Sequence, residues 1–280
     1  MLVINETSIL IDTIDTKKFQ NKTIGFVPTM GALHDGHIEL IRAAKLECDI
    51  IICSIYINPT QFNNVTDLEK YPRTLDDDIN LLEKNGCDIA FCPSDKEMFK
   101  MGNTLTIDFG EIGKVLEGEF RPGHFSGVGL IVGKFFNIIK PNISYFGQKD
   151  LQQFSIVKSL VQNLNFNIQL RCIPTVRSKD GLALSSRNAR LSKNGKEEAL
   201  VFYDSLVLAK QKLLKGETVD DITKEIKSKF NSDVVKLEYF EIVHQDTFEK
   251  INTFNNPENI AICIAGYVEG IRLIDNILLC

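Results

Sequence analysis

Two histidines three residues apart are the side chains best placed to do chemistry in this chain of 280 residues. His34 and His37 belong to segment 27–37, Val-Pro-Thr-Met-Gly-Ala-Leu-His-Asp-Gly-His, where a strand end, a glycine-bearing loop and a helix start follow one another. Residues i and i+3 share a helix face, and a helix N-terminus offers unpaired N–H groups at the positive end of its dipole. Gly31 and Gly36 carry no Cβ, so the backbone can approach a ligand closely. The segment therefore suits a triphosphate, although each histidine read alone also fits a surface residue beside an ordinary turn.

Two later segments offer further groups for phosphate. Segment 147–150, Gly-Gln-Lys-Asp, repeats the order of strand, glycine and helix start. Lys149 could reach phosphate oxygens, and Asp150 is well placed as a helix cap. Segment 184–187, Leu-Ser-Ser-Arg, offers two hydroxyls and a guanidinium, groups that can bind phosphate oxygens. Read alone, Lys149 also fits an exposed loop lysine, and Ser-Ser-Arg a polar linker.

Two amides and one acidic run complete the candidates. Gln61 follows a strand and a proline-containing turn, at the edge where open α/β sheets bind ligands. An amide can donate to a carboxylate and accept from a hydroxyl, which suits a hydroxy acid. Gln153, in a predicted helix, reads alone as a solvated residue. The run Asp76-Asp77-Asp78 fits either a magnesium site or acids at a helix N-terminus, and the helix interpretation is favoured because ATP phosphates supply most ligands of Mg²⁺.

The elements that must position these groups alternate through about residue 175. Short β-branched runs predict strands and longer periodic stretches predict helices, a rhythm typical of βαβ units and a parallel sheet. The stretch 123–140 is apolar on most faces, which predicts a helix buried against that sheet. The predicted strands are 23–27, 49–56, 88–92, 144–146 and 167–173, and the other predicted helices are 37–46, 75–84 and 151–164.

From residue 192 the pattern changes to two Lys-rich amphipathic helices, 196–214 and 219–230, followed by strands 237–243, 260–267 and 271–279. Residues 267–272 fit a hairpin. We therefore predict an ATP- and substrate-binding α/β domain over 1–175 and a smaller α+β domain over 176–280.

Composition excludes several classes of protein. Apolar residues make up 44% and charged residues 25% of the chain, values typical of a globular protein. The net charge of −5 argues against a nucleic-acid partner, because phosphate-backbone affinity comes mainly from clustered Lys and Arg. No apolar run approaches the length of a membrane span, and the N-terminus lacks the basic region of a signal peptide. Seven cysteines without a C-x-x-C pair fit reduced thiols. We predict a cytoplasmic protein without a membrane partner.

The histidine segment resembles the His-x-Gly-His signature of the nucleotidyltransferase superfamily. Within that superfamily the chain is similar to the pantoate–β-alanine ligases, and further blocks in the right order support the narrower resemblance. These blocks are 54–62, 71–78, 116–125, 146–153, 174–177 and 184–188. The resemblance implies a Rossmann-like parallel sheet of the nucleotidyltransferase type and a homodimer.

The resemblance also implies roles for individual residues. ATP would be bound by Pro28, Thr29, Met30, Gly31, Ala32, Leu33, His34, Asp35, Gly36, His37, Gly147, Gln148, Lys149, Asp150, Val176, Leu184, Ser185, Ser186 and Arg187. Among these, His34, His37, Lys149 and Arg187 would be catalytic. Gln61 and Gln153 would bind (R)-pantoate, and Gln61 would bind β-alanine as well. Read alone, Val176 indicates only the end of a strand.

The implied reaction joins (R)-pantoate to β-alanine at the expense of ATP, with Mg²⁺, through a pantoyl adenylate. Two alternatives stay open at this point. One is another His-x-Gly-His nucleotidyltransferase, which adenylylates a phosphate ester such as phosphopantetheine. The other is a non-catalytic nucleotide-binding sensor, because a fold does not fix a function.

Overall fold

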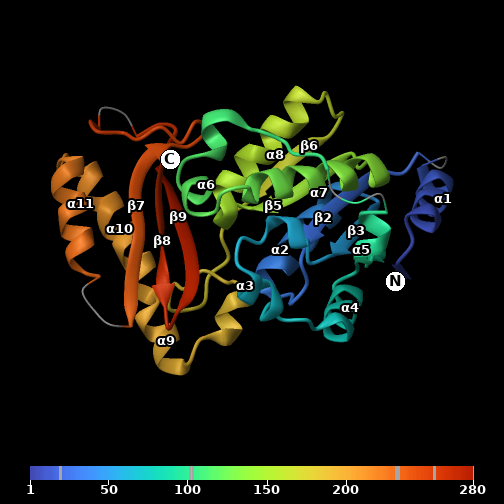
Figure 1. The fold of residues 1–280 in the computed structure, drawn as a ribbon, viewed down its shortest axis with the longest axis horizontal. Coiled ribbons are helices and arrows are strands. Elements are labelled where there is room, and N and C mark those ends of the chain that lie inside the picture. The colour runs from blue at the N-terminus through green and yellow to red at the C-terminus, as the bar shows by residue number, and fades with distance from the viewer. Residues whose placement is uncertain (19–20, 101, 103, 231–233, 255–256, 280) are drawn as a thin grey trace. The chain divides into compact units, whose positions relative to one another are not determined.

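The computed structural model describes residues 1–18, 21–100, 102, 104–230, 234–254 and 257–279 (Figure 1). The chain forms two compact units. The first comprises Met1–Gly147 and Gln153–Pro174, and the second comprises Gln148–Gln152 and Thr175–Cys280. The division into an ATP- and pantoate-binding domain over 1–175 and a smaller α+β domain over 176–280 stays a prediction. Among the described helices, none is long and apolar enough to cross a membrane.

The first unit is built on a six-stranded sheet in which every pairing is parallel. This confirms the predicted Rossmann-like parallel sheet. The strand order is β1-β4-β3-β2-β5-β6. The strands are β1 (Leu2–Ile4), β2 (Ile24–Thr29), β3 (Ile50–Ile55), β4 (Ile89–Phe91), β5 (Ile143–Gly147) and β6 (Gln169–Ile173).

Strand order reverses between β2 and β5, which are hydrogen-bonded neighbours. From β2 the chain moves through β3 and β4 toward one edge of the sheet, and β5 and β6 extend it toward the other edge. Open parallel sheets bind ligands beyond the carboxyl ends of the strands at such a reversal. The histidine segment follows β2, and Gly147 ends β5.

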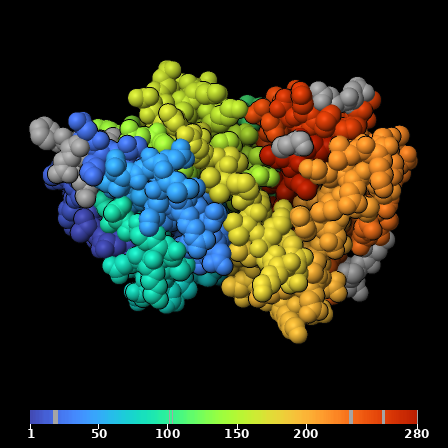
Figure 2. Space-filling view, turned by 180° about the vertical axis from the view of Figure 1, so that it is seen from behind, coloured from blue at the N-terminus to red at the C-terminus, as the bar shows by residue number. Residues whose placement is uncertain are grey.

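Helices cover both faces of this sheet. On one face, α1 (Thr7–Lys18), α7 (His124–Ile139) and α8 (Leu151–Asn163) pack over an apolar core that includes Phe26, Phe91 and Phe136. On the other face lie α2 (Asp35–Glu47) and α4 (Leu75–Lys84), whose Ile41 and Leu82 are fully buried (Figure 1). The opposite side of α4 is at the surface, at the lower left of Figure 2. The predicted burial of α7 is confirmed, because its apolar side chains form much of the first core.

Short helical turns connect these elements. They are η1 (Pro59–Gln61), α3 (Val65–Glu69), α5 (Asp95–Met98), η2 (Gly110–Gly113) and α6 (Glu117–Phe120) in the first unit, and η3 (Gln148–Asp150) and η4 (Ser186–Arg190) in the second.

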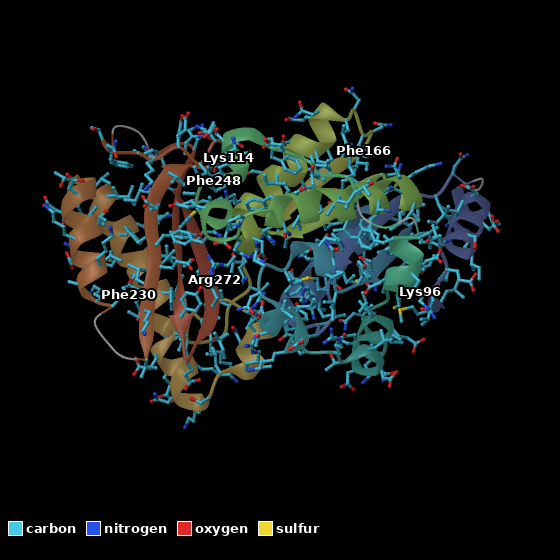
Figure 3. The ribbon with its side chains drawn as sticks, viewed as in Figure 1. Lys96, Lys114, Phe166, Phe230, Phe248 and Arg272 are labelled. Atoms are coloured by element: carbon cyan, nitrogen blue, oxygen red, sulfur yellow. The ribbon has the colours of Figure 1, made fainter. Side chains whose placement is uncertain are left out.

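The second unit packs α10 (Leu200–Leu214) and α11 (Val219–Ser228) against an antiparallel sheet of β7 (Val235–His244), β8 (Ile260–Val268) and β9 (Ile271–Leu279). Phe230, which is labelled in Figure 3, belongs to the shared core, and its ring centroid lies 5.4 Å from that of Phe202. This is the predicted α+β architecture. The expected hairpin joins β8 to β9 through Glu269 and Gly270, both with positive φ, as a two-residue type I′ turn requires.

One predicted helix is wrong in its extent. The pattern of 196–214 predicts a single helix, but α9 (Lys193–Glu198) and α10 are separate. At the junction the N–H of Phe202 donates to the carbonyl of Ala199, three residues back, which tightens the turn. Ser192 caps α9 by accepting a hydrogen bond from the N–H of Gly195.

Candidate active site

Helix α2 begins with a cap formed by the two histidines. His34 is the N-cap residue, and its Nδ1 accepts a hydrogen bond from the N–H of Gly36 at 3.1 Å. The Nδ1 of His37 accepts from the N–H of His34 at 3.3 Å, which closes a reciprocal capping box. The ring centroids are 4.1 Å apart. Because each Nδ1 is an acceptor, the hydrogen-bond network assigns the proton of each neutral ring to Nε2.

The loop before this helix is held by Asp78. One carboxylate oxygen accepts from the N–H of Ala32 at 2.9 Å and the other from the N–H of Leu33 at 2.7 Å. Gly31 and Ala32 both have positive φ, and a Cβ on Gly31 would lie 3.0 Å from Asp78 Oδ2. Glycine therefore meets two requirements here, the backbone conformation and the close approach of the carboxylate. Burial raises the pKa of Asp78, and the two backbone hydrogen bonds oppose that rise.

The acidic run lies in the first turn of α4, as the helix interpretation predicted. Its members differ in environment, because Asp76 and Asp77 are exposed whereas Asp78 is buried. The position of Leu82, one helical turn later and also buried, shows that Asp78 shares the inward face of α4. Among the described residues, no three His, Cys, Asp or Glu side chains converge to hold a metal ion.

Gln61 lies in η1, which follows β3, and its side-chain amide is buried. The Oε1 atom accepts from Nδ2 of Asn58 at 3.1 Å, and Nε2 donates to Sδ of Met30 at 3.2 Å. Met30 belongs to the loop that leads to the two histidines. The structure therefore brings the predicted pantoate amide against the predicted ATP loop.

The backbone of Gln61 is held by the first turns of α7. Its carbonyl oxygen lies 2.8 Å from Nδ1 of the buried His124. Gly127 allows α7 to approach η1, because a Cβ there would lie 2.4 Å from the carbonyl oxygen of Thr60. Asn58 joins the two elements, since its Nδ2 also donates to the carbonyl of Gly127 at 3.1 Å. The N-terminal turns of α7 therefore position Gln61, in addition to the packing of the helix in the core.

The remaining candidate of the first unit, Gln153, is the third residue of α8 and is half-buried.

In the second unit, Lys149 lies in η3 with a side chain that is 17% exposed. Its Nζ is 3.8 Å from a carboxylate oxygen of Asp150. Lys149 and Ser185 line the same cavity, together with Tyr203 and Asp275. Two residues that were predicted to bind ATP phosphates from distant segments therefore share one cavity.

The other candidates of this unit form a small antiparallel turn. The N–H of Leu184 donates to the carbonyl of Val176 at 2.9 Å, and Arg177 pairs with Ala183 in an isolated bridge. Ser185 then caps η4 by accepting from the N–H of Arg187 at 3.3 Å. Val176, which sequence alone marked only as a strand end, is thereby held next to the Ser-Ser-Arg segment.

Strand β9 holds both predicted ATP segments of the second unit. Asp275 forms a two-point pair with Arg177, at 2.5 and 2.9 Å, and Arg177 lies over the Tyr203 ring. Asn276 donates to the carbonyls of Gln148 and Lys149. Burial raises the pKa of Asp275, and Arg177 opposes the rise.

Sequence reasoning missed the roles of four residues that hold the candidates in place, Asn58, Asp78, Asp275 and Asn276. A signal was present in the last two, because Asp-Asn interrupts the otherwise apolar end of β9. Adjacent buried polar side chains in a strand need partners. The sequence spacing of these residues does not show which distant residues are their partners.

Comparisons with known proteins show the family to which the chain belongs. A family model described as Pantoate-beta-alanine ligase matches residues 2–278. A pantothenate synthetase from Cytophaga hutchinsonii is 46% identical over 265 residues, which cover 94% of each chain. The crystal structure of pantothenate synthetase from Thermus thermophilus superposes with a TM-score of 0.93 at 33% identity, covering 100% of this chain and 99% of that one. A Francisella tularensis pantoate-beta-alanine ligase, complexed with beta-gamma ATP and beta-alanine, gives a TM-score of 0.82 at 38% identity, covering 99% and 97%. The chain therefore belongs to the pantoate–β-alanine ligase family.

Proposed function

We propose that this protein joins (R)-pantoate to β-alanine in an ATP-dependent condensation, and that the residues assembled above carry out its two steps. Membership of the ligase family supports the reaction. The observation that carries the assignment of residues is the contact between the Gln61 amide and Met30, because it places an amide suited to a hydroxy acid against the histidine-bearing loop.

In the first step a carboxylate oxygen of pantoate attacks the α-phosphorus of ATP. A new O–P bond forms, the bond from the α-phosphorus to the bridging oxygen breaks, and pyrophosphate leaves with pantoyl adenylate remaining. A carboxylate is already nucleophilic, so this step requires no general base. Catalysis comes from alignment of the reactants and from stabilisation of the charge that develops on the phosphates.

His34 and His37 are the proposed donors to those phosphates in the first unit. Their Nδ1 atoms are engaged in the helix cap, so the donor that each neutral ring presents is Nε2–H. Both rings begin α2, where the backbone also favours negative charge. The cap fixes the tautomer and the orientation of the donor together.

In the second unit, Lys149 and Arg187 are the proposed cations for the phosphates, with the hydroxyls of Ser185 and Ser186. The proximity of Lys149 and Ser185, which line the same small cavity, supports this proposal. We propose that Mg²⁺ enters with ATP and takes most of its ligands from the phosphate oxygens.

In the second step the amine of β-alanine attacks the acyl carbon of pantoyl adenylate. A C–N bond forms, the acyl–oxygen bond to phosphate breaks, AMP leaves, and the amine loses a proton. Gln61 and Gln153 are the proposed amides that hold pantoate through both steps, and Gln61 also binds β-alanine. The two hydrogen-bond partners that fix the Gln61 amide, Asn58 and Met30, support a preorganised role.

We further propose that the protein is a cytoplasmic homodimer. Family resemblance supports the dimer, and size-exclusion chromatography with light scattering tests it, since a mass near 31.6 kDa instead of twice that value would contradict it.

The reaction is tested by measuring pyrophosphate release from MgATP with (R)-pantoate, followed by AMP release after addition of β-alanine. Release of both products, each dependent on its own substrate, is expected. Pyrophosphate without AMP would leave the adenylation site intact and contradict β-alanine as the acceptor. Pyrophosphate with phosphopantetheine in place of pantoate would favour the other nucleotidyltransferase. ATP binding without release of either product would favour the sensor.

A further inference from the structure

Both the NH₂ group and the oxygen of the Asn276 side-chain amide, in β9, form hydrogen bonds with one segment, Gln148–Lys149. Its Nδ2 donates to the carbonyl of Gln148 at 3.0 Å and to the carbonyl of Lys149 at 2.9 Å. Its Oδ1 accepts from Nε2 of Gln148 at 3.2 Å. Asn276 is only 3% exposed, so water cannot replace these bonds without a rearrangement.

The two carbonyls belong to the peptide planes on either side of the Lys149 Cα atom. Each peptide unit is planar, so its orientation is set once its carbonyl is fixed. Fixing both planes that flank one residue fixes φ and ψ of that residue, and thereby the direction of its Cα–Cβ bond. Asn276 therefore determines the direction in which the Lys149 side chain leaves the backbone.

Lys149 lies 3.8 Å from the Asp150 carboxylate, and a second carboxylate nearby, that of Asp275, is paired with an arginine. Asp275 lines the cavity that contains Lys149, and an unpaired carboxylate there would attract the ammonium away from a phosphate. Arg177 instead occupies both carboxylate oxygens of Asp275. Arg177 also donates to the carbonyl of Asn276, so the pair fixes the backbone from which the Asn276 amide projects.

From this geometry we infer that Asn276 is a positioning residue for Lys149, through which the C-terminal strand β9 controls the binding and activation of ATP. The inference rests on the proposed function, in which Lys149 binds ATP phosphates. Asn276 acts through the backbone of Lys149 and does not itself touch ATP.

The test is a double-mutant cycle on pyrophosphate release, with kcat and the KM for ATP measured for each protein. The variants are Asn276→Ala, Asn276→Asp, Lys149→Ala and the double variant Asn276→Ala with Lys149→Ala. Asn276→Asp keeps the shape and the acceptor for Gln148, but it replaces the donor to both carbonyls by a second acceptor. A misplacement of about 1 Å at a reacting group can cost about 10²-fold, so each Asn276 variant is expected to lose about 10- to 100-fold in kcat/KM for ATP.

The double variant separates positioning from a general structural effect. If Asn276 acts through Lys149, adding Asn276→Ala to Lys149→Ala costs less than about 3-fold further, because the group being positioned is already gone. A full 10- to 100-fold further loss in the double variant would overturn the proposal, and so would wild-type kinetics of a folded Asn276 variant. If neither Asn276 variant folds, the residue is structural and the proposal is likewise overturned.

Lys210→Met is the matched control. Its Nζ donates to the carbonyl of Leu278 at 2.9 Å, so, like Asn276, Lys210 forms a hydrogen bond between a side-chain donor and a backbone carbonyl, here that of a β9 residue. It is expected to change thermal stability and leave the kinetics as in wild type. Loss of activity in this control equal to that of Asn276→Ala would overturn the specific role of Asn276. A wild-type protein that releases no pyrophosphate would instead contradict the proposed function.

Discussion

The carboxylate of Asp78 accepts a hydrogen bond from the backbone N–H of Leu33 at 2.7 Å, across 45 residues of sequence. The other carboxylate oxygen accepts a second hydrogen bond, from the N–H of Ala32, so the contact is bidentate. The loop so held has two successive residues with positive φ, Gly31 and Ala32. A non-glycine residue adopts this conformation at a cost, so the bidentate contact stabilises a loop shape that the chain would otherwise leave.

Asp78→Asn is expected to weaken the two hydrogen bonds to the loop while keeping the size of the side chain. One carboxylate oxygen becomes an NH₂ group that faces a backbone donor, so one hydrogen bond is lost and one buried N–H is left without its acceptor. Such a loss costs about 1–3 kcal/mol. Urea denaturation should show that decrease in the free energy of unfolding, and kcat for pyrophosphate release should fall about 10-fold or more.

Asp77→Asn provides the control for Asp78, because it makes the same chemical change in the same helical turn at an exposed position. It should leave both stability and kcat near wild type. Equal effects of the two variants would mean that the helix N-terminus, and not the loop contact, accounts for the result.

Substitutions of His37 should separate its capping role from its proposed phosphate contact. Asparagine can place an acceptor near the position of Nδ1, so His37→Asn should keep the cap and the thermal stability while losing the Nε2–H donor. A charge-stabilising group contributes about 10²–10⁴-fold, and the adenylation rate should fall by that amount. His37→Gln, whose amide reaches toward the Nε2 position, should recover part of the rate. Near wild-type turnover of His37→Asn would remove Nε2 from the mechanism.

Elements with strong local signals were predictable from sequence. Helix α4 has the predicted bounds, Leu75–Lys84, because its acidic first turn and its apolar stripe both indicate a helix over the same residues. By contrast, β1 and α1 were missed. Strand β1 has three residues, and α1 exposes Ile9 and Ile11 while burying Leu10 and Ile14, so the apolar pattern does not mark one face.

For the candidate site, the sequence predicted candidate reactive side chains but not the residues that hold them in place. Types and spacing singled out His34 and His37, whereas the roles predicted for Lys149 and Gln61 also needed the family resemblance, because each residue alone fits an ordinary loop position. The residues that hold them act across the fold. Asn276 lies 127 residues from Lys149, and no local pattern encodes such a pairing.

The pH dependence of stability should include a contribution from Glu97. Its Oε1 accepts from the N–H of Thr7 at 2.9 Å and from Nζ of Lys100 at 2.9 Å. The hydrogen bonds from Thr7 and then Lys100 lower the pKa of Glu97 from 4.5 to about 2 in the folded protein. The unfolded chain binds the proton more tightly, so the stabilisation is fully present above about pH 4.5 and is lost as the pH falls toward 2.

Thermal unfolding of wild type and Glu97→Gln across that pH range measures this contribution. The midpoint of the variant should lie below that of wild type at pH 7, and the difference should shrink as the pH falls below 4.5. Lys100→Met, which removes one of the two partners, should give a smaller difference of the same sign. A difference between wild type and Glu97→Gln that is constant with pH would contradict the role of the Glu97 charge.

Arg187→Ala should impair the two half-reactions unequally. Arg187 lies in η4, directly after the Ser185 and Ser186 hydroxyls, and its proposed role is to follow charge onto the departing pyrophosphate. Only the first half-reaction expels pyrophosphate. Adenylate formation, measured as pyrophosphate release, should therefore fall more than AMP release from preformed pantoyl adenylate and β-alanine. Arg190→Ala, three residues later in η4, is the control and should change neither half-reaction by a comparable factor. If Arg187→Ala slowed both half-reactions equally, the guanidinium would act on the part of the ligand that both share, the adenylyl phosphate, and a role specific to pyrophosphate would be excluded.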